Sequence, residues 1–264
     1  MSRADCWDFR WIERGEGEPV VLLHGLMGRP EHWQATLDAL AASCRPMALA
    51  LPIFDRELPE ASLPGLTDYV REFLDAQGLQ KAVVGGNSLG GHVALELALS
   101  DPARVSGLIL TGSSGLFERS FTHGVPHRPT SAWIREKMEE VFYNPAHVTT
   151  EWVETVQQTI GVRSSVLRLL QAARSAKSRN IEGQLSSLGM PTCLIWGEDD
   201  RITPADVARR FKALIPQADL FLLPRCGHAP MLEQPALFNW ILKYWLLHVR
   251  WAHAAPALPA GAAA

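Results

Sequence analysis

The sequence predicts an α/β protein built on a mostly parallel β-sheet with helices on both faces. Short apolar runs alternate with longer stretches of helical periodicity, which is the pattern of repeated strand–helix units. The 264 residues and a hydrophobic content of 47% allow one large domain with a sizeable core. Charged residues make up 20% and the formal net charge is −3, so the composition argues against a disordered chain and against an electrostatic nucleic-acid binder.

Seven apolar runs are the strand candidates, and five longer periodic stretches are the helix candidates. The strands are expected at residues 9–13, 20–23, 46–51, 81–85, 107–111, 192–196 and 219–223. The helices are expected at residues 31–42, 66–76, 90–100, 204–215 and 235–249. Thr203 is the expected N-cap of the helix that Pro204 opens, and Asp206 favours the positive end of that helix.

The alternation of strands and helices stops between about Leu116 and Gly189. This stretch contains three helical patterns, at residues 130–142, 149–160 and 164–177, and no strand pattern. A helical insertion between two strands is expected to cover the strand ends as a lid. The expected organisation is an α/β core of residues 1–115 and 190–250, a helical lid of residues 116–189, and a disordered tail of residues 251–264 that is rich in Ala and Pro.

Six aromatic residues of the insertion are candidates for the wall of an acyl pocket, although most are expected to pack the lid onto the core: Phe117, Phe121, Trp133, Phe142, Tyr143 and Trp152. No run of about 18 apolar residues is present, so no membrane-spanning helix is expected. The first eight residues lack the apolar core of a secretory signal, which makes the cytoplasm the expected location. The four cysteines form no C-x-x-C pair, so buried reduced thiols are expected and a metal site is not.

A serine stands between two glycines at residues 86–90, which read Gly-Asn-Ser-Leu-Gly. The segment follows the apolar run 82–84 and precedes the helical stretch 92–99, so the serine lies at a strand-to-helix turn. Glycine is needed at such a tight turn because it leaves the space beside the serine empty without strain. The arrangement is typical of a nucleophile elbow and makes Ser88 the candidate nucleophile.

A serine hydroxyl needs a general base, and histidine suits this role because its ordinary pKa lies near 6.5. His228 follows the last expected strand, which brings it to the carboxyl edge of the sheet where Ser88 emerges. His92, one helical turn beyond Ser88, is expected to be structural. An imidazole base also needs a carboxylate to fix its tautomer. Three carboxylates follow the strand at 192–196 and crowd one loop: Glu198, Asp199 and Asp200.

Two backbone amides are expected to stabilise the oxyanion that forms when serine attacks a carbonyl group. One belongs to Leu89, immediately after the candidate nucleophile. The second is expected from Leu26, in the loop 24–28 after a strand, because Gly25 lets the backbone turn inward. His24 is expected to bind the backbone of this loop.

The order of Ser88, an acid at 198–200 and His228 matches the chain order of the α/β-hydrolases. The sequence resembles this family over nearly its whole length, from about residue 7 to residue 249. The resemblance rests on four motifs: His24-Gly25, the elbow at 86–90, Gly197 with Asp200, Arg201 and Pro204, and Gly227-His228 with Glu233 and Pro235. It implies the α/β-hydrolase fold and a Ser-His-Asp triad. In relatives with this acid loop the triad acid lies three residues after the glycine, which selects Asp200.

Relatives that open epoxides or displace halide carry aspartate as nucleophile, so the serine at position 88 argues against these two activities. The elbow is similar to that of C–C bond hydrolases that act on meta-ring-fission products. The chain departs from that subfamily in three places: Leu26-Met27 replace its glycine-rich loop, Ala229 replaces its tryptophan, and the segment 150–154 lacks its carboxylate-binding arginine.

The leading expectation is therefore a serine hydrolase that cleaves small to medium, largely apolar carboxylic esters through an acyl-enzyme. The alternatives are a C–C bond hydrolase for meta-ring-fission products, a menaquinone-pathway lyase of the same fold, and a ligand-binding module without turnover. The expected partner is a small-molecule ester, with no nucleic acid, membrane, cofactor or metal. The oligomeric state and the natural acyl and alcohol groups stay open.

Overall fold

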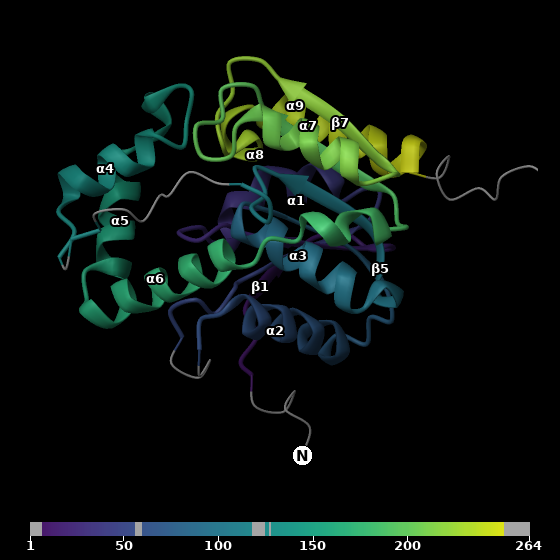
Figure 1. Cartoon of the computed structure of the whole chain (residues 1–264), viewed down its shortest axis with the longest axis horizontal. Coiled ribbons are helices and arrows are strands. Elements are labelled where there is room, and N and C mark those ends of the chain that lie inside the picture. The colour runs from purple at the N-terminus through teal and green to yellow at the C-terminus, as the bar shows by residue number, and fades with distance from the viewer. Residues whose placement is uncertain (1–6, 56–59, 118–124, 127, 251–264) are drawn as a thin grey trace, which may run out of the picture.

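A seven-stranded β-sheet forms the centre of the molecule in this computed structural model, which describes residues 7–55, 60–117, 125–126 and 128–250 (Figure 1). The strand order is β1-β3-β2-β4-β5-β6-β7, with β1 antiparallel to β3 and every other pair parallel. The strands are β1 (Trp11–Glu13), β2 (Pro19–Leu23), β3 (Arg45–Leu49), β4 (Ala82–Asn87), β5 (Val105–Thr111), β6 (Thr192–Gly197) and β7 (Ala218–Leu223). All seven expected strands are present, with ends shifted by at most about two residues.

Helices cover both faces of the sheet. On one face lie α2 (Leu63–Ala76), α3 (Leu89–Ser100) and α7 (Ala205–Leu214), whose apolar residues form one core cluster with the sheet. On the other face lie α1 (Gln34–Leu40) and α9 (Pro235–Tyr244), which contribute to a second cluster. The predicted fold class, a mostly parallel sheet with flanking helices, is confirmed.

Burial explains why the central strands read as continuous apolar runs. Every residue of β4 and of β6 is buried, because helices cover both faces of a parallel sheet. The helix α2 instead buries one face and exposes the other. The Ser62 hydroxyl caps its N-terminus by accepting a hydrogen bond from the Gly65 amide at 3.3 Å. The hydrophobic pattern of the sequence therefore places the sheet in the middle layer.

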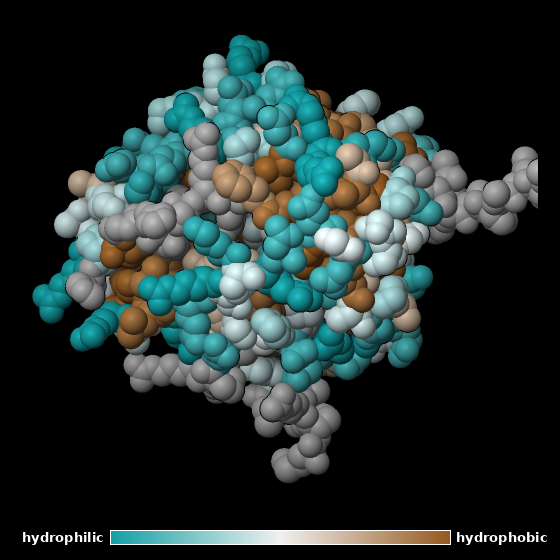
Figure 2. Space-filling model, viewed as in Figure 1, coloured by the Kyte–Doolittle hydropathy of each residue, from teal (hydrophilic) through white to brown (hydrophobic). Residues whose placement is uncertain are grey.

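Three longer helices lie between β5 and β6 in the chain and are called the helical insertion here. They are α4 (Ser131–Glu139), α5 (Thr150–Ile160) and α6 (Arg163–Ser178), with the short 3-10 turn η4 (Pro145–His147) between the first two. They lie to one side of the sheet, at the left of Figure 1, where Figure 2 shows hydrophobic side chains gathered on the surface. The hydroxyls of Thr130 and Thr149 cap α4 and α5.

Two expectations about helix ends were wrong. Pro204, not Thr203, is the N-cap of α7, because the Thr203 hydroxyl donates instead to the buried Asp200 carboxylate at 2.9 Å. The last helix is α-helical only to Tyr244 and continues as a π-helical turn, and a short helix α8 (Pro230–Glu233) precedes it.

No helix among the described residues is long and apolar enough to cross a membrane. The expected tail 251–264, Phe121 and Cys6 lie outside the described residues.

Candidate active site

The serine elbow is a strained turn between β4 and α3. Ser88 has φ 54° and ψ −117°, a conformation that residues with side chains rarely adopt. A Cβ atom on Gly86 would lie 2.4 Å from the backbone carbon of Gly90, and one on Gly90 would lie 2.3 Å from the oxygen of Leu23. Both glycines are therefore required sterically, and together they allow the chain to turn sharply around the serine.

His228 and Asp200 form a buried pair. The Nδ1 atom of His228 lies 2.8 Å from Oδ2 of Asp200, and the two residues are 6% and 4% exposed. The carboxylate also accepts hydrogen bonds from the amides of Ile202 (2.8 Å) and Thr203 (2.9 Å) and from the Thr203 hydroxyl (2.9 Å). An ionised carboxylate can only accept hydrogen bonds, so the proton of the neutral imidazole lies on Nδ1, which faces Asp200. Nε2 is then free to accept a proton.

The other two acids of the loop point away from this pair. Glu198 and Asp199 are exposed, and their amides donate to the oxygens of Leu223 and Cys226. A Cβ atom on Gly197 would lie 2.1 Å from the oxygen of Gly227, so the acid loop lies directly against the histidine loop. The structure brings Asp200 to the imidazole, but not its two acidic neighbours.

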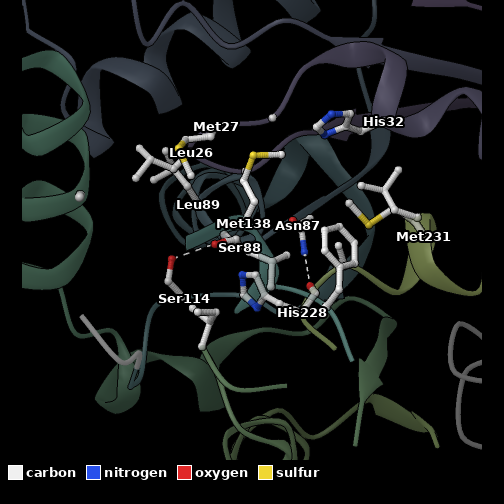
Figure 3. A pocket seen from close by; sticks show the side chains of 18 of the residues that line it. Leu26, Met27, His32, Asn87, Ser88, Leu89, Ser114, Met138, His228 and Met231 are labelled. Carbon is white, nitrogen blue, oxygen red and sulfur yellow. Dashed lines mark hydrogen bonds between the residues drawn. The ribbon is translucent and has the colours of Figure 1, made fainter. Parts of the chain in front are cut away.

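Ser88 and His228 line the same pocket (Figure 3). Among the described residues no hydrogen bond joins the serine hydroxyl to the imidazole, and such contacts in unliganded sites are often long. Leu26 and Leu89 also line the pocket. The Leu89 amide is in the first turn of α3 and has no acceptor within the helix, and no acceptor for the Leu26 amide is found in the described part of the chain. Neither amide therefore has a protein acceptor in the described part of the chain.

The helical insertion supplies one wall of this pocket. The cavity offers about 130 Å³ to water-sized molecules, room for a small to medium organic group. Eight of its lining residues come from the insertion: Met138, Val141, Phe142, Trp152, Val156, Ala173, Ala176 and Lys177. Of the five expected aromatics that the structure describes, Phe142 and Trp152 line the pocket, while Phe117, Trp133 and Tyr143 do not.

Two other histidines near the elbow are neutral and structural. Nδ1 of His24 lies 2.8 Å from the Gly25 oxygen, and Nε2 accepts from the Leu51 amide at 2.9 Å, as expected for a residue that binds loop backbone. Burial lowers the pKa of His24 to about 4 and that of His92 to about 3. The contact of His92 with Glu96 at 3.9 Å is therefore not an ion pair at neutral pH, because the imidazole carries no charge there.

Cys226 is also structural. Burial and the neighbouring Glu233 carboxylate raise the pKa of its thiol, which keeps the thiol protonated and unreactive. Cys44 and Cys193 are buried free thiols whose pKa values burial also raises. Among the described residues, no group of three or more His, Cys, Asp or Glu side chains could hold a metal ion.

Several residues that shape the site were missed by the sequence analysis. The Asn87 side-chain amide donates to the oxygens of His228 (2.8 Å) and Thr111 (3.0 Å), which ties the elbow to the histidine loop (Figure 3). Lys177 lines the pocket and lies on α6, outside the segment 150–154 in which the resemblance places a carboxylate-binding arginine. His32 lines it too, and burial lowers the pKa of its imidazole to about 3. These contacts join distant parts of the chain, and no local pattern signals them.

A serine at a strained elbow and a histidine that pairs with a buried aspartate, both at one pocket, are the arrangement of the serine hydrolases with an α/β fold. The sequence profile of the Alpha/beta hydrolase family matches residues 20–239, and the chain belongs to this family.

The chain is similar to C–C hydrolases, esterases and an acyltransferase component. It is 34% identical to the "Dihydrolipoyllysine-residue acetyltransferase component of acetoin cleaving system" of Pseudomonas putida over 87% of its own length but only 64% of that protein's length, so it spans less than two thirds of this relative. It is 28% identical to "2-hydroxy-6-oxononadienedioate/2-hydroxy-6-oxononatrienedioate hydrolase 2" of the same organism, over 89% of this chain and 90% of that protein.

Solved structures support the same class. An α/β hydrolase enzyme from the metagenome of lagoon sediments of Mar Chica, Morocco, is 34% identical, with a TM-score of 0.74 over 91% of this chain and 95% of that one. A thermophilic esterase from Thermogutta terrifontis is 25% identical, with a TM-score of 0.78 over 92% of this chain and 94% of that one. Named relatives therefore fall on both sides of the choice between ester and C–C bond hydrolysis.

Proposed function

We propose that this protein is a carboxylic ester hydrolase that acts on small to medium, largely apolar esters through an acyl-enzyme. The observation that carries the proposal is the shared pocket of Ser88 and His228, with His228 Nδ1 2.8 Å from the buried Asp200 carboxylate. The similarity to an esterase of known structure supports it.

In the proposed reaction, Oγ of Ser88 attacks the carbonyl carbon of the ester while its proton moves to Nε2 of His228. The carbonyl oxygen gains negative charge and accepts hydrogen bonds from the amides of Leu26 and Leu89. Asp200 stabilises the imidazolium that has formed. The bond to the alkoxy oxygen then breaks, and His228 returns the proton to the leaving alcohol, which leaves Ser88 acylated.

Water completes the cycle. A water molecule gives a proton to His228 as its oxygen attacks the acyl carbon, and the Ser88 ester bond breaks. The imidazolium returns this proton to Ser88, and the carboxylic acid leaves. The sum is one ester and one water converted to one acid and one alcohol, which requires no cofactor.

The helical insertion acts as the lid of this site in the proposed function, and its apolar side chains select the acyl or aryl group. Met138, Phe142 and Trp152 support this role because they line the pocket together with Ser88. A largely apolar wall favours apolar substrate groups, since burying them removes their surface from water.

A series of p-nitrophenyl esters with acyl chains of graded length tests the proposal. We expect Ser88-dependent hydrolysis with an optimum at a short to medium acyl chain. Absence of such hydrolysis in the folded wild-type protein, combined with binding of an ester, would indicate a ligand-binding module instead.

C–C bond hydrolysis of a meta-ring-fission dienoate is the second candidate, and Lys177 is the observation that favours it. This lysine is the one Lys or Arg among the described residues that line the pocket, and it forms no ion pair with a described carboxylate. An ammonium group at the pocket can hold the carboxylate of a dienoate. The name of the similar dienedioate hydrolase is consistent with such a substrate.

Comparing kcat/KM for a neutral aryl ester with kcat/KM for a ring-fission dienoate separates the two candidates. If the dienoate is preferred by more than about tenfold, which corresponds to about 1.4 kcal/mol, the ester proposal is wrong. In that case Lys177→Met should raise KM for the dienoate, while Lys81→Met, an exposed lysine remote from the pocket lining, should leave it unchanged.

A further inference from the structure

The end of α4 is bonded to the loop that carries His228. The amide of His228 donates to the backbone oxygen of Val141 at 2.7 Å. A Cβ atom on Gly227 would lie 2.4 Å from the same oxygen, so the two backbones are in direct contact. The backbone of His228, the proposed general base, is thereby fixed to the helical insertion.

Glu233 joins the same two segments from the other side. Its carboxylate accepts hydrogen bonds from the amides of Gly227 (2.6 Å), Asn144 (2.7 Å) and Tyr143 (3.2 Å). Gly227 neighbours His228, whereas Tyr143 and Asn144 follow the end of α4. Hydrogen bonds to an ionised carboxylate are stronger than those between neutral groups, so one side chain holds the two backbones together.

The segment held in this way is also pocket wall. Met138, Val141 and Phe142 line the cavity at the end of α4. A group that presses on this wall therefore presses on backbone bonded to His228, and a displacement of about 1 Å in a reacting group is enough to cost about a hundredfold in rate.

The opposite part of the insertion is anchored elsewhere. The side chains of Gln171 and Ser175 on α6 accept hydrogen bonds from the amides of Ala61 and Leu63, at the beginning of α2. Arg179, just after α6, pairs with Glu96 of α3. In the described part of the chain, no hydrogen bond joins α5 or α6 to the histidine loop.

We propose that Glu233 is a positioning residue that couples one wall of the pocket, formed by Met138, Val141 and Phe142 at the end of α4, to His228. The fit of the substrate against this wall then sets kcat. Its fit against the α5–α6 wall, which includes Trp152 and Val156, sets KM. The proposal rests on the proposed hydrolase function. It divides the helical insertion into a part that controls the rate and a part that controls affinity.

The first test is Glu233→Gln, because glutamine keeps the size but turns an NH₂ group toward a backbone donor. We expect kcat for the preferred aryl ester to fall about 10- to 100-fold, with KM within about twofold of wild type. Glu154→Gln, an exposed glutamate on α5, is the matched control and should change neither value. Wild-type kcat in folded Glu233→Gln would overturn the positioning role.

A matched pair of wall substitutions keeps the test valid if Glu233→Gln does not fold. Val141→Ala and Val156→Ala remove the same atoms from the two walls. We expect Val141→Ala to lower kcat and Val156→Ala to raise KM with kcat nearly unchanged. If both variants change only KM, the coupling is wrong.

Hydrogen exchange separates this proposal from the proposed function. The amides of Tyr143, Asn144 and Gly227 should exchange faster in Glu233→Gln than in wild type, whether or not an ester is turned over. Unchanged exchange at all three would overturn the clamp itself. Faster exchange in a protein that hydrolyses no ester would keep the clamp and refute the ester hydrolase.

Discussion

The triad loops and the helical insertion are held by different kinds of contact. The loops are fixed largely by backbone: the Ser88 amide donates to the Thr111 oxygen, and the acid loop lies against the histidine loop at Gly197. α6 of the insertion is anchored to the core through side chains, such as those of Gln171 and Arg168, which bind backbone of residues 61 and 53. Backbone contacts fix atoms tightly and depend on few side chains, whereas side-chain contacts vary readily. We infer that the loops, with the end of α4 that is bonded to them, set the reaction, and that α5 and α6 of the insertion set its substrate.

The largest expected effect comes from the serine. Ser88→Ala should lower ester turnover by about 10³- to 10⁶-fold, because the nucleophile is lost while binding and the amide donors remain. Steady-state rates of the purified variant measure the turnover, and circular dichroism shows whether the variant is folded. Ser114→Ala is the matched control, since Ser114 lines the same pocket and its hydroxyl lies 3.4 Å from the backbone oxygen of Ser88, not from its hydroxyl. A folded Ser88→Ala protein with near wild-type activity would remove the assignment.

The acid loop offers a sharper comparison between adjacent residues. Asp200→Asn should lower kcat by at least about a hundredfold, because a neutral side chain no longer fixes the tautomer of His228 or stabilises its charged form. Asp199→Asn, which alters an exposed side chain, should change kcat by less than about twofold. The reverse ranking would move the acid by one residue.

A substitution on α5 of the insertion should act on substrate selection more than on the chemical steps. Trp152 lines the pocket, and its ring lies 5.1 Å from that of His32. Trp152→Leu should change KM about three- to tenfold and shift the acyl-length preference, because the pocket becomes wider there. Rates across the ester series measure both effects. A loss of kcat comparable with that of Asp200→Asn would contradict the division between the two regions.

The smallest expected effect concerns stability and pH. The pKa of His92 is about 3 in the folded protein and about 6.5 in an unfolded chain, so the unfolded state binds more protons between these values. The contribution of His92 to the free energy of unfolding is therefore fully present above about pH 6.5 and is lost as the pH is lowered toward 3. For one such histidine the slope reaches about 1.4 kcal/mol per pH unit.

The variant His92→Gln removes this titration. Urea unfolding at several pH values between about 4.5 and 7.5 should show a shallower loss of stability on acidification than wild type, whatever the absolute stability of the variant. His24, with a pKa of about 4, keeps its own contribution in both proteins. An unchanged slope would show that His92 is not buried in its neutral form.

The sequence by itself determined the sheet, the helices and the nature of the site, because the signals involved are local. Apolar runs and helical periodicity indicate which residues of one element are buried. The glycines at 86 and 90 indicate a tight turn, because a side chain at either position would collide with neighbouring backbone. Ser88 and His228 could be nominated from such signals, since each follows a strand and parallel strands bring their carboxyl ends to one edge.

The tertiary structure decided the contacts between distant segments. Three carboxylates follow β6, and the family resemblance selects Asp200 among them. The folded loop supplies the physical reason: Asp200 is buried against His228, and the Thr203 hydroxyl donates to its carboxylate and does not cap α7. Lys177 reaches the pocket from α6, and Glu233 binds amides about 90 residues away, at the end of α4. These positions depend on how separately folded elements pack against each other, which periodicity within one element does not encode.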